Sequence, residues 1–318
     1  MAPAHCTVPA VTDRLMLLDS ASLYFRAFFG VPGSVTAPDG TPVNAVRGFL
    51  DMLARLVTDH SPDALVCCWD DDWRPAFRVA AIPTYKAHRL LDEATNTEET
   101  PDELSPQVPV IVDVLAALGV ARAGAPGYEA DDVIGTLAAR AVGDGVGAVD
   151  VVTGDRDLFQ VVDDEHRVRV LYTARGIRDL DVIDLARLRE KYGVASGQGY
   201  ADLAALRGDP SDGLPGVPGI GEKTAASLLA RFGDLAGVIA AAADRTTDIP
   251  KGQRAKLLAG LDYLAVAPAV VQVARDAPVA VHDPALPAEP ADLDWLVALS
   301  DTWGLRSSIN RLLAALER

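Results

Sequence analysis

The stretch Leu15-Met-Leu-Leu-Asp19 is a short apolar run that ends in an aspartate, and it sets the pattern of the first half of the chain. Two further runs have the same form: Ala64–Trp69 followed by Asp70, and Val149–Thr153 followed by Gly154 and Asp155. Helical patterns separate the runs, at Ala45–Thr58, Val108–Leu118 and Asp131–Val142. Buried strands that alternate with helices predict an α/β fold, with a mostly parallel central sheet covered by helices on both faces.

The second half of the chain is different in character. Val168–Tyr172 and Ile177–Ile183 have the pattern of a hairpin that turns at Ala174–Gly176, and Ala277–Asp292 has the Pro- and Ala-rich composition of a linker. Helical patterns begin at Asp184, and they are Asp184–Tyr192, Ala201–Leu206, Lys223–Phe232, Lys256–Val266 and Trp295–Leu316. The expected parts are therefore an α/β core at 1–183, a helical region at 184–280, and a linker with a C-terminal helix at 281–318.

Composition narrows the class of protein. With 318 residues and 49% hydrophobic content, the chain can bury a large core, which excludes disordered and collagen-like classes. No apolar run reaches the roughly 18–20 residues that a membrane span needs, and the N-terminus has no secretory pattern. Three cysteines, Cys6, Cys67 and Cys68, form neither a disulfide framework nor a C-x-x-C pair. We expect a reduced, soluble, cytoplasmic protein with no membrane partner.

The net charge of −16 is the main argument against a nucleic-acid ligand, because phosphate binding depends on Lys and Arg. Net charge is a global average, however. A protein whose carboxylates cluster around divalent metal ions can be acidic overall and still bind a polyanion locally.

Aspartates follow all three apolar runs, at Asp19, Asp70 and Asp155. Since the carboxyl ends of parallel strands meet at one edge of a sheet, these side chains should converge on one crevice. The alternative is that each is a helix N-cap, a position that Asp favours. Further acids lie on loops and element ends, and they are Glu129, Asp131, Asp132, Asp157, Asp209 and Asp212. Nine carboxylates without a His or Cys motif favour a hard cation, Mg²⁺ or Mn²⁺, and suggest two or more ions.

The Gly-rich segment 215–224 invites a phosphate-loop interpretation that it does not satisfy. Glu222 separates Gly221 from Lys223, so the Gly-Lys-Ser/Thr order of a nucleotide-binding loop is broken. A Gly-rich turn before a helix can instead present backbone amides to a nucleic-acid phosphate without reading bases. The alternative is a plain connection between two helices.

In their order along the chain, these motifs resemble the bacterial 5′-nuclease family, which includes the 5′-exonuclease domain of DNA polymerase I and the flap endonucleases. The matching elements are Asp19, Asp70, Glu129-x-Asp131-Asp132, Thr153-Gly-Asp155-Arg-Asp157 and Gly208-Asp209-x-x-Asp212. Leu214–Ala225 looks like the helix–three-turn–helix motif, at about 203–232, and Tyr85–Arg89 looks like the start of the helical arch, at about 77–107. The likeness covers roughly residues 14–280 and implies a PIN-like α/β nuclease core with a helical DNA-binding region.

The resemblance also implies residue roles. Asp19, Asp70, Glu129 and Asp131 would hold one metal ion and Asp155, Asp157 and Asp212 a second, with Asp132 and Asp209 near both. Lys86 and Arg89 would reach from the arch to the scissile phosphate. The implied DNA contacts are Phe25, Arg26, Phe28, Arg78, Gly216, Val217, Gly219, Ile220, Gly221, Lys223 and Thr224, and backbone carbonyls from Val217 to Ile220 could bind K⁺.

The implied function is a monomeric, metal-dependent 5′–3′ exonuclease and 5′-flap endonuclease that acts in replication, by RNA primer removal, and in repair. Its partners would be DNA with a 5′ flap, a 5′ overhang, or a nick or gap, and RNA–DNA hybrids. Two departures stand out: Leu90–Thr100 is longer and more acidic than in relatives, and a chain of 318 residues has no room for a polymerase, which indicates a free-standing nuclease. The competing interpretations are a non-catalytic structure-specific DNA-binding protein, a PIN-type RNase and an acidic scaffold.

Overall fold

The computed structural model describes residues 12–92 and 94–317, so Cys6 and the first part of the 1–183 core lie outside the described residues. Its centre is a sheet that contains six strands in the described part of the chain, in the order β5-β2-β1-β6-β7-β8. The strands are β1 (Arg14–Asp19), β2 (Ala64–Cys68), β5 (Ala121–Ala123), β6 (Ala148–Thr153), β7 (Val168–Tyr172) and β8 (Asp181–Ile183). All pairings from β5 to β7 are parallel, and β8 runs antiparallel to β7. The predicted mostly parallel sheet and the hairpin are confirmed.

Side chains of the central strand β1 alternate between two hydrophobic cores, as the pleat requires. Leu15 and Leu17 lie in one core, which continues into the helical region, whereas Met16 and Leu18 lie in the other. The helix α5 (Ala130–Gly143) covers the first face. The second face is covered by α1 (Ser20–Gly30) and by four further helices. They are α2 (Asn44–His60), α4 (Gln107–Leu118), α12 (Leu293–Trp303) and α13 (Arg306–Leu316).

Two of the predicted helices are each divided into two. The pattern at Lys256–Val266 belongs to α10 (Lys251–Ala259) and α11 (Leu261–Val271), which meet at Gly260. The pattern at Trp295–Leu316 belongs to α12 and α13, because Gly304 takes a left-handed conformation with φ +63° and ends α12. Periodicity continues across such short turns, so the sequence pattern alone did not separate the helices.

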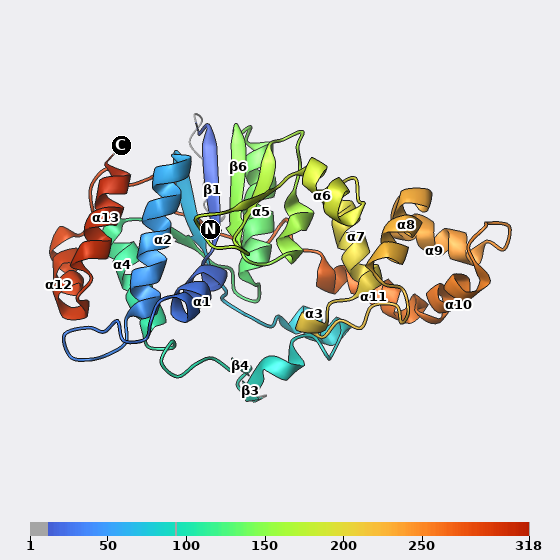
Figure 1. Cartoon of the computed structure of the whole chain (residues 1–318), viewed down its shortest axis with the longest axis horizontal. Helices are drawn as coiled ribbons and strands as arrows, with labels where there is room; N and C mark the ends of the chain where they lie inside the picture. Colours follow the sequence, from blue (N-terminus) through green and yellow to red (C-terminus); the bar gives the residue numbers. More distant parts are fainter. Residues whose placement is uncertain (1–11, 93, 318) are drawn as a thin grey trace, which may run out of the picture.

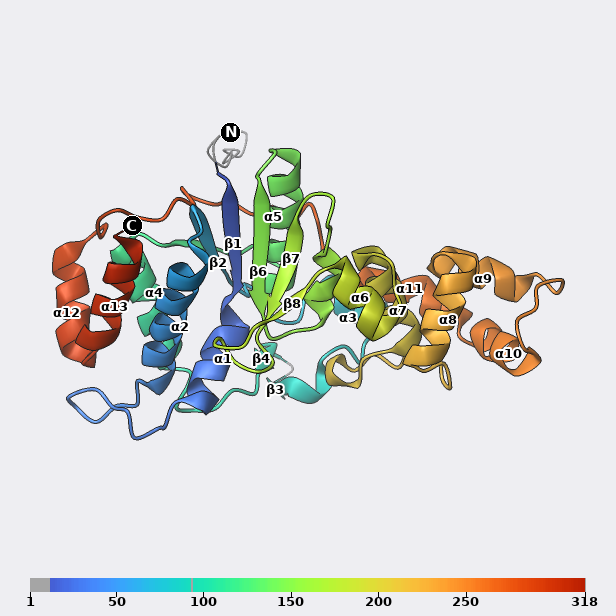
Figure 2. The same ribbon diagram turned by 45° about the horizontal axis from the view of Figure 1, so that its top comes forward.

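The helical region extends from the β8 side of the sheet, while α12 and α13 lie beside α2 and α4 at the opposite end of the molecule (Figures 1 and 2). The helices of the helical region are α6 (Leu185–Tyr192), α7 (Gly197–Arg207), α8 (Glu222–Phe232), α9 (Leu235–Ala243), α10 and α11. Within the described residues no single helix is long and apolar enough to cross a membrane, and only the pair α8–α9, bent by 85°, passes that test by length and composition.

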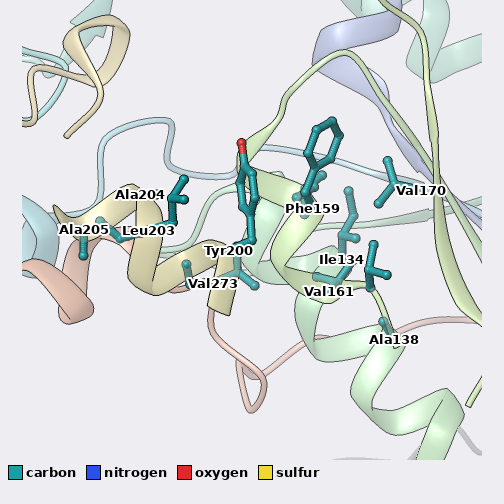
Figure 3. Close-up of a cluster of buried hydrophobic side chains, with 14 of the residues drawn as sticks. Ile134, Ala138, Phe159, Val161, Val170, Tyr200, Leu203, Ala204, Ala205 and Val273 are labelled. Atoms are coloured by element: carbon teal, nitrogen blue, oxygen red, sulfur yellow. The ribbon is translucent and has the colours of Figure 1, made fainter. Parts of the chain in front are cut away.

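Aromatic side chains join the helical region to the sheet domain. Phe159, in the 3₁₀ turn Asp157–Val161, packs against Tyr200 of α7 with ring centroids 5.3 Å apart. Tyr172 and Tyr192 complete the cluster. Figure 3 shows the Phe159 and Tyr200 rings side by side, with Val170 on the sheet side. One continuous core therefore fixes the helical region against the edge of the sheet.

The segment that was expected to form a helical arch, at about 77–107, has little helix. Among the described residues of this segment, α3 (Ala76–Ala81) and a 3₁₀ turn at Ala87–Arg89 are the only helical parts before α4, and a short hairpin pairs β3 (Leu90–Asp92) with β4 (Thr97–Glu98). The polar sequence between the 3₁₀ turn and α4 has no apolar repeat that could stabilise a longer helix. The hairpin is not a detached excursion, because the indole nitrogen of Trp73 donates a hydrogen bond of 2.7 Å to the Asn96 carbonyl.

Gly213 holds the base of this segment against the helical region. Thr84 Oγ1 donates to the Gly213 carbonyl at 2.9 Å, and the Lys86 amide donates to the Asp212 carbonyl at 2.9 Å. Gly213 has φ +71°, and a Cβ atom there would lie 2.2 Å from the Thr84 carbonyl oxygen. Both the conformation and the close approach require glycine.

Gly213→Ala is therefore expected to destabilise the protein more than Gly176→Ala, measured as the free energy of unfolding in urea. Gly176 has φ +91° but nothing within 4 Å of a built Cβ, so its substitution isolates the cost of the left-handed conformation, about 1–2 kcal/mol. Gly213→Ala adds a backbone clash to that cost. Equal losses for the two variants would show that the docking of Thr84 on Gly213 contributes nothing.

Candidate active site

A pocket of about 260 Å³ opens at the carboxyl ends of β1, β2 and β6. Its acidic lining is Asp19, Asp70, Glu129, Asp131 and Asp155, and Glu98 adds a carboxylate from β4. Lys86 and Arg89 line the same pocket. The predicted convergence of the three strand-end aspartates on one crevice is confirmed.

Of these three aspartates, Asp19 is a helix N-cap as the alternative interpretation expected, whereas Asp70 and Asp155 are not. Asp19 caps α1, since its Oδ1 accepts the Ser22 amide at 3.0 Å, while its Oδ2 accepts the Thr153 hydroxyl at 2.6 Å. Asp70 accepts the Ala130 amide at the start of α5, at 2.8 Å. For Asp19 the two interpretations do not exclude each other, because the N-cap residue also lines the pocket. Asp70 binds the first amide of a helix that Glu129 caps, and Asp155 precedes a turn whose N-cap is Arg156.

A second acidic group lies next to the first, on 3₁₀ turns. Asp157 begins the turn after β6, and Asp209 and Asp212 belong to the turn after α7. Asp155 is common to both groups: burial, followed by the charge of Asp155, raises the pKa of Asp131 and of Asp157 well above the ordinary aspartate value. The two acidic groups therefore share one electrostatic environment.

The carboxylates are not fully compensated by cations of the chain. Burial raises the pKa of Asp19 to about 7, and the neighbouring Asp70 and Asp155 add to this rise. The Asp131 carboxylate makes no hydrogen bond or ion pair with another side chain or amide within residues 12–92 and 94–317, and the charges of Asp155, Asp19 and Glu129 surround it. Such an all-oxygen set, with raised pKa values, has the donor chemistry that fits a hard divalent cation.

Two basic side chains currently neutralise part of this set. The Lys86 ammonium pairs with Glu129 Oε2, and Arg89 Nη2 lies 2.9 Å from Asp212 Oδ1. In this arrangement no three His, Cys, Asp or Glu side chains of the described residues form a group that could hold a metal ion as they stand. Glu129 and Asp212 are turned toward these cations, one from each acidic group.

Asp132 does not have the arrangement of a metal ligand, which corrects the sequence-based expectation. It is 0% exposed, and both of its oxygens are engaged: Arg78 binds them at 2.7 and 2.8 Å, and the amides of Glu129 and Ala274 donate to them at 3.2 and 2.8 Å. A carboxylate saturated by four donors has a structural function here.

Arg78 is likewise not a DNA contact. Its side chain is 3% exposed and is held by Glu129, by Asp132 and by backbone carbonyls at the end of α11. The Phe-Arg sequence carried no signal of this burial, because an arginine with several internal acceptors cannot be recognised from local pattern.

The Gly-rich turn presents only part of its predicted contact set. Val217 and Ile220 are buried, and their amides donate to the carbonyls of Leu206 and Val217, which corrects the expectation that both bind DNA. Gly219 is exposed, as are Gly221, the N-cap of α8, and Lys223 in its first turn. Gly216 is buried and Thr224 is half-buried. The exposed amides and Lys223 form the surface that a phosphate could reach.

The helix α1 places its aromatic residues beside the pocket. Phe25 lines the pocket, as does Tyr24, which sequence reasoning missed although it is the adjacent residue. Arg26 lies near Gly154, and Phe28 stacks edge-to-face on Phe29 farther along the helix. Trp73 and Glu98 were missed as well. Glu98 belongs to an acidic stretch whose register against Leu90 gives no signal in sequence.

A parallel sheet with carboxylates at its carboxyl edge, joined to a helical region with a Gly-rich turn, defines a nuclease of the 5′ type. The chain belongs to the 5′-3′ exonuclease family: residues 14–193 match the model of its N-terminal resolvase-like domain, and residues 195–294 match the model of its C-terminal SAM fold.

Known relatives agree with this assignment. A 5′-3′ exonuclease of Streptomyces coelicolor is 62% identical over 304 residues, which cover 95% of this chain and 99% of that protein. DNA polymerase I of Mycobacterium bovis is 39% identical over 300 residues, which cover 94% of this chain and 31% of that protein. The D15 flap endonuclease of bacteriophage T5, solved with DNA and metal ions, has the same fold, with a TM-score of 0.63, 19% identity, and coverage of 96% of this chain and 100% of that one.

The raised pKa of Asp19 predicts a stability that falls with pH in metal-free protein. The folded protein binds a proton at Asp19 up to about pH 7, whereas the ordinary aspartate pKa of 3.8 applies when the chain is unfolded. Stability from this group is therefore lost as pH rises through that window. Asp19→Asn keeps a good N-cap and should raise the free energy of unfolding at pH 8, in EDTA, by at least about 1 kcal/mol.

The matched control is Asp59→Asn, which removes a surface carboxylate paired with Arg55 and should change stability little. Thermal unfolding at pH 5 and pH 8 measures both variants. A gain for Asp19→Asn that is no larger at pH 8 than at pH 5 would contradict the electrostatic origin.

Proposed function

We propose that this chain hydrolyses DNA phosphodiesters near a free 5′ end or at a 5′-flap junction, and that the reaction depends on Mg²⁺ or Mn²⁺. The observation that carries the proposal is the crevice itself, in which buried carboxylates with raised pKa values face two basic side chains at the carboxyl edge of a parallel sheet. The T5 enzyme, whose fold this chain shares, was solved with DNA and metal ions, which supports the same ligands here.

The residues that would hold the ions are the two acidic groups. Asp19, Asp70, Glu129 and Asp131 would hold one, and Asp155, Asp157 and Asp212 would hold a second, with Asp209 beside them. When bound, such ions activate water and stabilise the leaving oxygen of a phosphodiester. Asp155, which lies between the groups, would contribute to both.

The basic side chains have a separate function in this proposal. Lys86 pairs with Glu129, and Arg89 pairs with Asp212. If those carboxylates bound metal ions instead, the two basic side chains would be free to face the scissile phosphate. A cation held against the phosphate stabilises the charge that develops in the transition state.

DNA would be held away from the crevice, at the start of α8. The exposed amides of Gly219 and Gly221 and the Lys223 ammonium can bind backbone phosphates, which confers affinity for duplex without base specificity. We also propose that carbonyls of this turn bind K⁺, and that the substrates include 5′ overhangs, nicks, gaps and RNA–DNA hybrids. The proposed role is removal of RNA primers in replication, and repair. The proposed form is a monomer in the cytoplasm.

Asp155→Ala is expected to lower turnover at least about 100-fold while DNA affinity stays equal or increases, because it removes a metal ligand and also a negative charge that repels DNA. The test uses a 5′-labelled flap duplex with Mg²⁺ or Mn²⁺, with product lengths mapped and DNA affinity measured in EDTA. Asp181→Ala is the control, since Asp181 lies on β8, outside the crevice, and pairs with Arg187 of α6. Cleavage by the wild-type protein in excess EDTA, or a near wild-type rate for Asp155→Ala, would refute the proposal.

Metal binding is expected to release Lys86 from Glu129. The chain has five lysines, so acetylation followed by mass spectrometry can monitor each one. Lys86, whose side chain is 12% exposed, should react slowly in EDTA and faster with Mg²⁺, whereas exposed Lys223 should react equally in both. Lys86→Ala should lower the single-turnover rate by roughly 100- to 1000-fold with a small change in DNA affinity.

The acetylation of Lys223 is the internal control for the reagent. An unchanged Lys86 rate on addition of Mg²⁺, or a Lys86→Ala defect confined to DNA affinity, would show that Lys86 serves only as a counter-ion within the fold.

A further inference from the structure

The buried pair Arg78–Asp132 lies behind the crevice and does not line it. The Arg78 guanidinium binds Asp132 through two nitrogens, at 2.7 and 2.8 Å, and binds Glu129 Oε1 at 3.0 Å. Arg78 is 3% exposed and Asp132 is fully buried. Removal of three charges from water is costly, and such a group is often replaceable by apolar residues without loss of stability. Its presence here therefore calls for a more specific explanation than stability.

Glu129 is the group that this pair positions. Its Oε1 accepts hydrogen bonds from Arg78 and from the Tyr85 hydroxyl, at 2.7 Å from the latter, so that Oε2 is left for Lys86 and the pocket. Asp132 also accepts the Glu129 amide. Main chain and side chain of Glu129 are thus both fixed by the pair, and the carboxylate has one oxygen directed to the crevice.

The pair also connects Glu129 to the helical region. Arg78 Nε donates to the Val270 carbonyl at 3.0 Å, and Asp132 accepts the Ala274 amide at 2.8 Å, both at the end of α11. At the other end of α11, Gly260 packs against Val217 of the Gly-rich turn, since a Cβ on Gly260 would lie 3.1 Å from the Val217 side chain. An eleven-residue helix, about 16 Å long, therefore joins the turn to Arg78.

We infer that Arg78 and Asp132 are positioning residues that orient Glu129 for metal binding and couple it, through α11, to DNA bound at the Gly-rich turn. The inference rests on the proposed function, because it takes Glu129 as a metal ligand and the turn as a DNA contact. It assigns no contact with substrate to either residue. α11 transmits the coupling because its two ends touch the two sites, and a helix moves as a unit.

The test measures the Mn²⁺ affinity of the protein by calorimetry, with and without duplex DNA closed by a hairpin loop at each end, so that the DNA has neither a free 5′ end nor a 5′ flap to cleave. Arg78→Lys keeps the charge but loses the two-nitrogen contact with Asp132, and should weaken Mn²⁺ binding by about 10- to 100-fold. DNA affinity in EDTA should change less than about twofold. Bound DNA should strengthen Mn²⁺ binding in the wild-type protein, and this enhancement should be lost in Arg78→Lys.

Arg140→Lys is the matched control. Arg140, on α5, also binds backbone carbonyls of the segment after α11, those of Ala277 and Val279, but it touches no carboxylate of the crevice. This variant should keep the wild-type Mn²⁺ affinity and its enhancement by DNA. If Arg78→Lys does not fold, Asp132→Asn, which keeps the side-chain shape, replaces it in the same measurements and should weaken Mn²⁺ binding in the same direction.

Wild-type Mn²⁺ affinity in folded Arg78→Lys, or an equal loss in Arg78→Lys and Arg140→Lys, would overturn the inference and leave the pair a purely structural role. Wild-type protein that binds no Mn²⁺ would instead refute the proposed function, so the two failures are distinguishable. An absence of any enhancement by DNA in the wild-type protein would overturn the coupling through α11.

Discussion

Mutual repulsion between carboxylates at one edge of a parallel sheet is the constraint on which the rest of the structure depends. The strand order places the ends of β1, β2 and β6 side by side, so Asp19, Asp70 and Asp155 cannot avoid one another. The chain moderates the repulsion with helix N-termini behind Asp19 and Asp70 and with Lys86 and Arg89 in front. The negative charge that remains uncompensated at this edge would attract a divalent cation, and these carboxylates contribute to the net charge of −16.

The sequence was most informative where local pattern and topology coincide. A parallel sheet puts every strand end at one edge, so apolar runs that end in Asp19 and Asp70 were enough to predict the crevice. It was least informative where burial depends on distant partners. The sequence predicted that Arg78 contacts DNA, but in the structure α5 and the end of α11 enclose it. The sequence predicted that Asp132 is a metal ligand, but its carboxylate binds Arg78. The division of the last helix at Gly304 and the hairpin around Asn96 depended on backbone conformation, which hydrophobic periodicity does not report.

The same contrast separates the two halves of the site. The acidic groups lie on regular elements and short turns, so each side chain is within one or two residues of a strand or helix end. The basic groups lie on a segment with little regular structure, and Lys86 itself has a left-handed conformation with φ +49°. Contacts with the turn at Asp212 and Gly213, rather than local propensity, determine where Lys86 and Arg89 lie. Any change in that turn would therefore be transmitted to both cations at once.

The packing of α12 and α13 on α2 has a consequence for the synthesis of the chain. The second core is closed by residues from the two ends of the sequence, since Leu23 and Val46 are buried in the same cluster as Leu299 and Leu312. The ribosome synthesises α2 about 250 residues before α12 and α13, the helices that cover its apolar face. At about 5–20 residues per second, this face remains uncovered by them for tens of seconds. The second core is thus complete only after the helical region has been made, so apolar surface of α2 stays exposed until α12 and α13 have been synthesised.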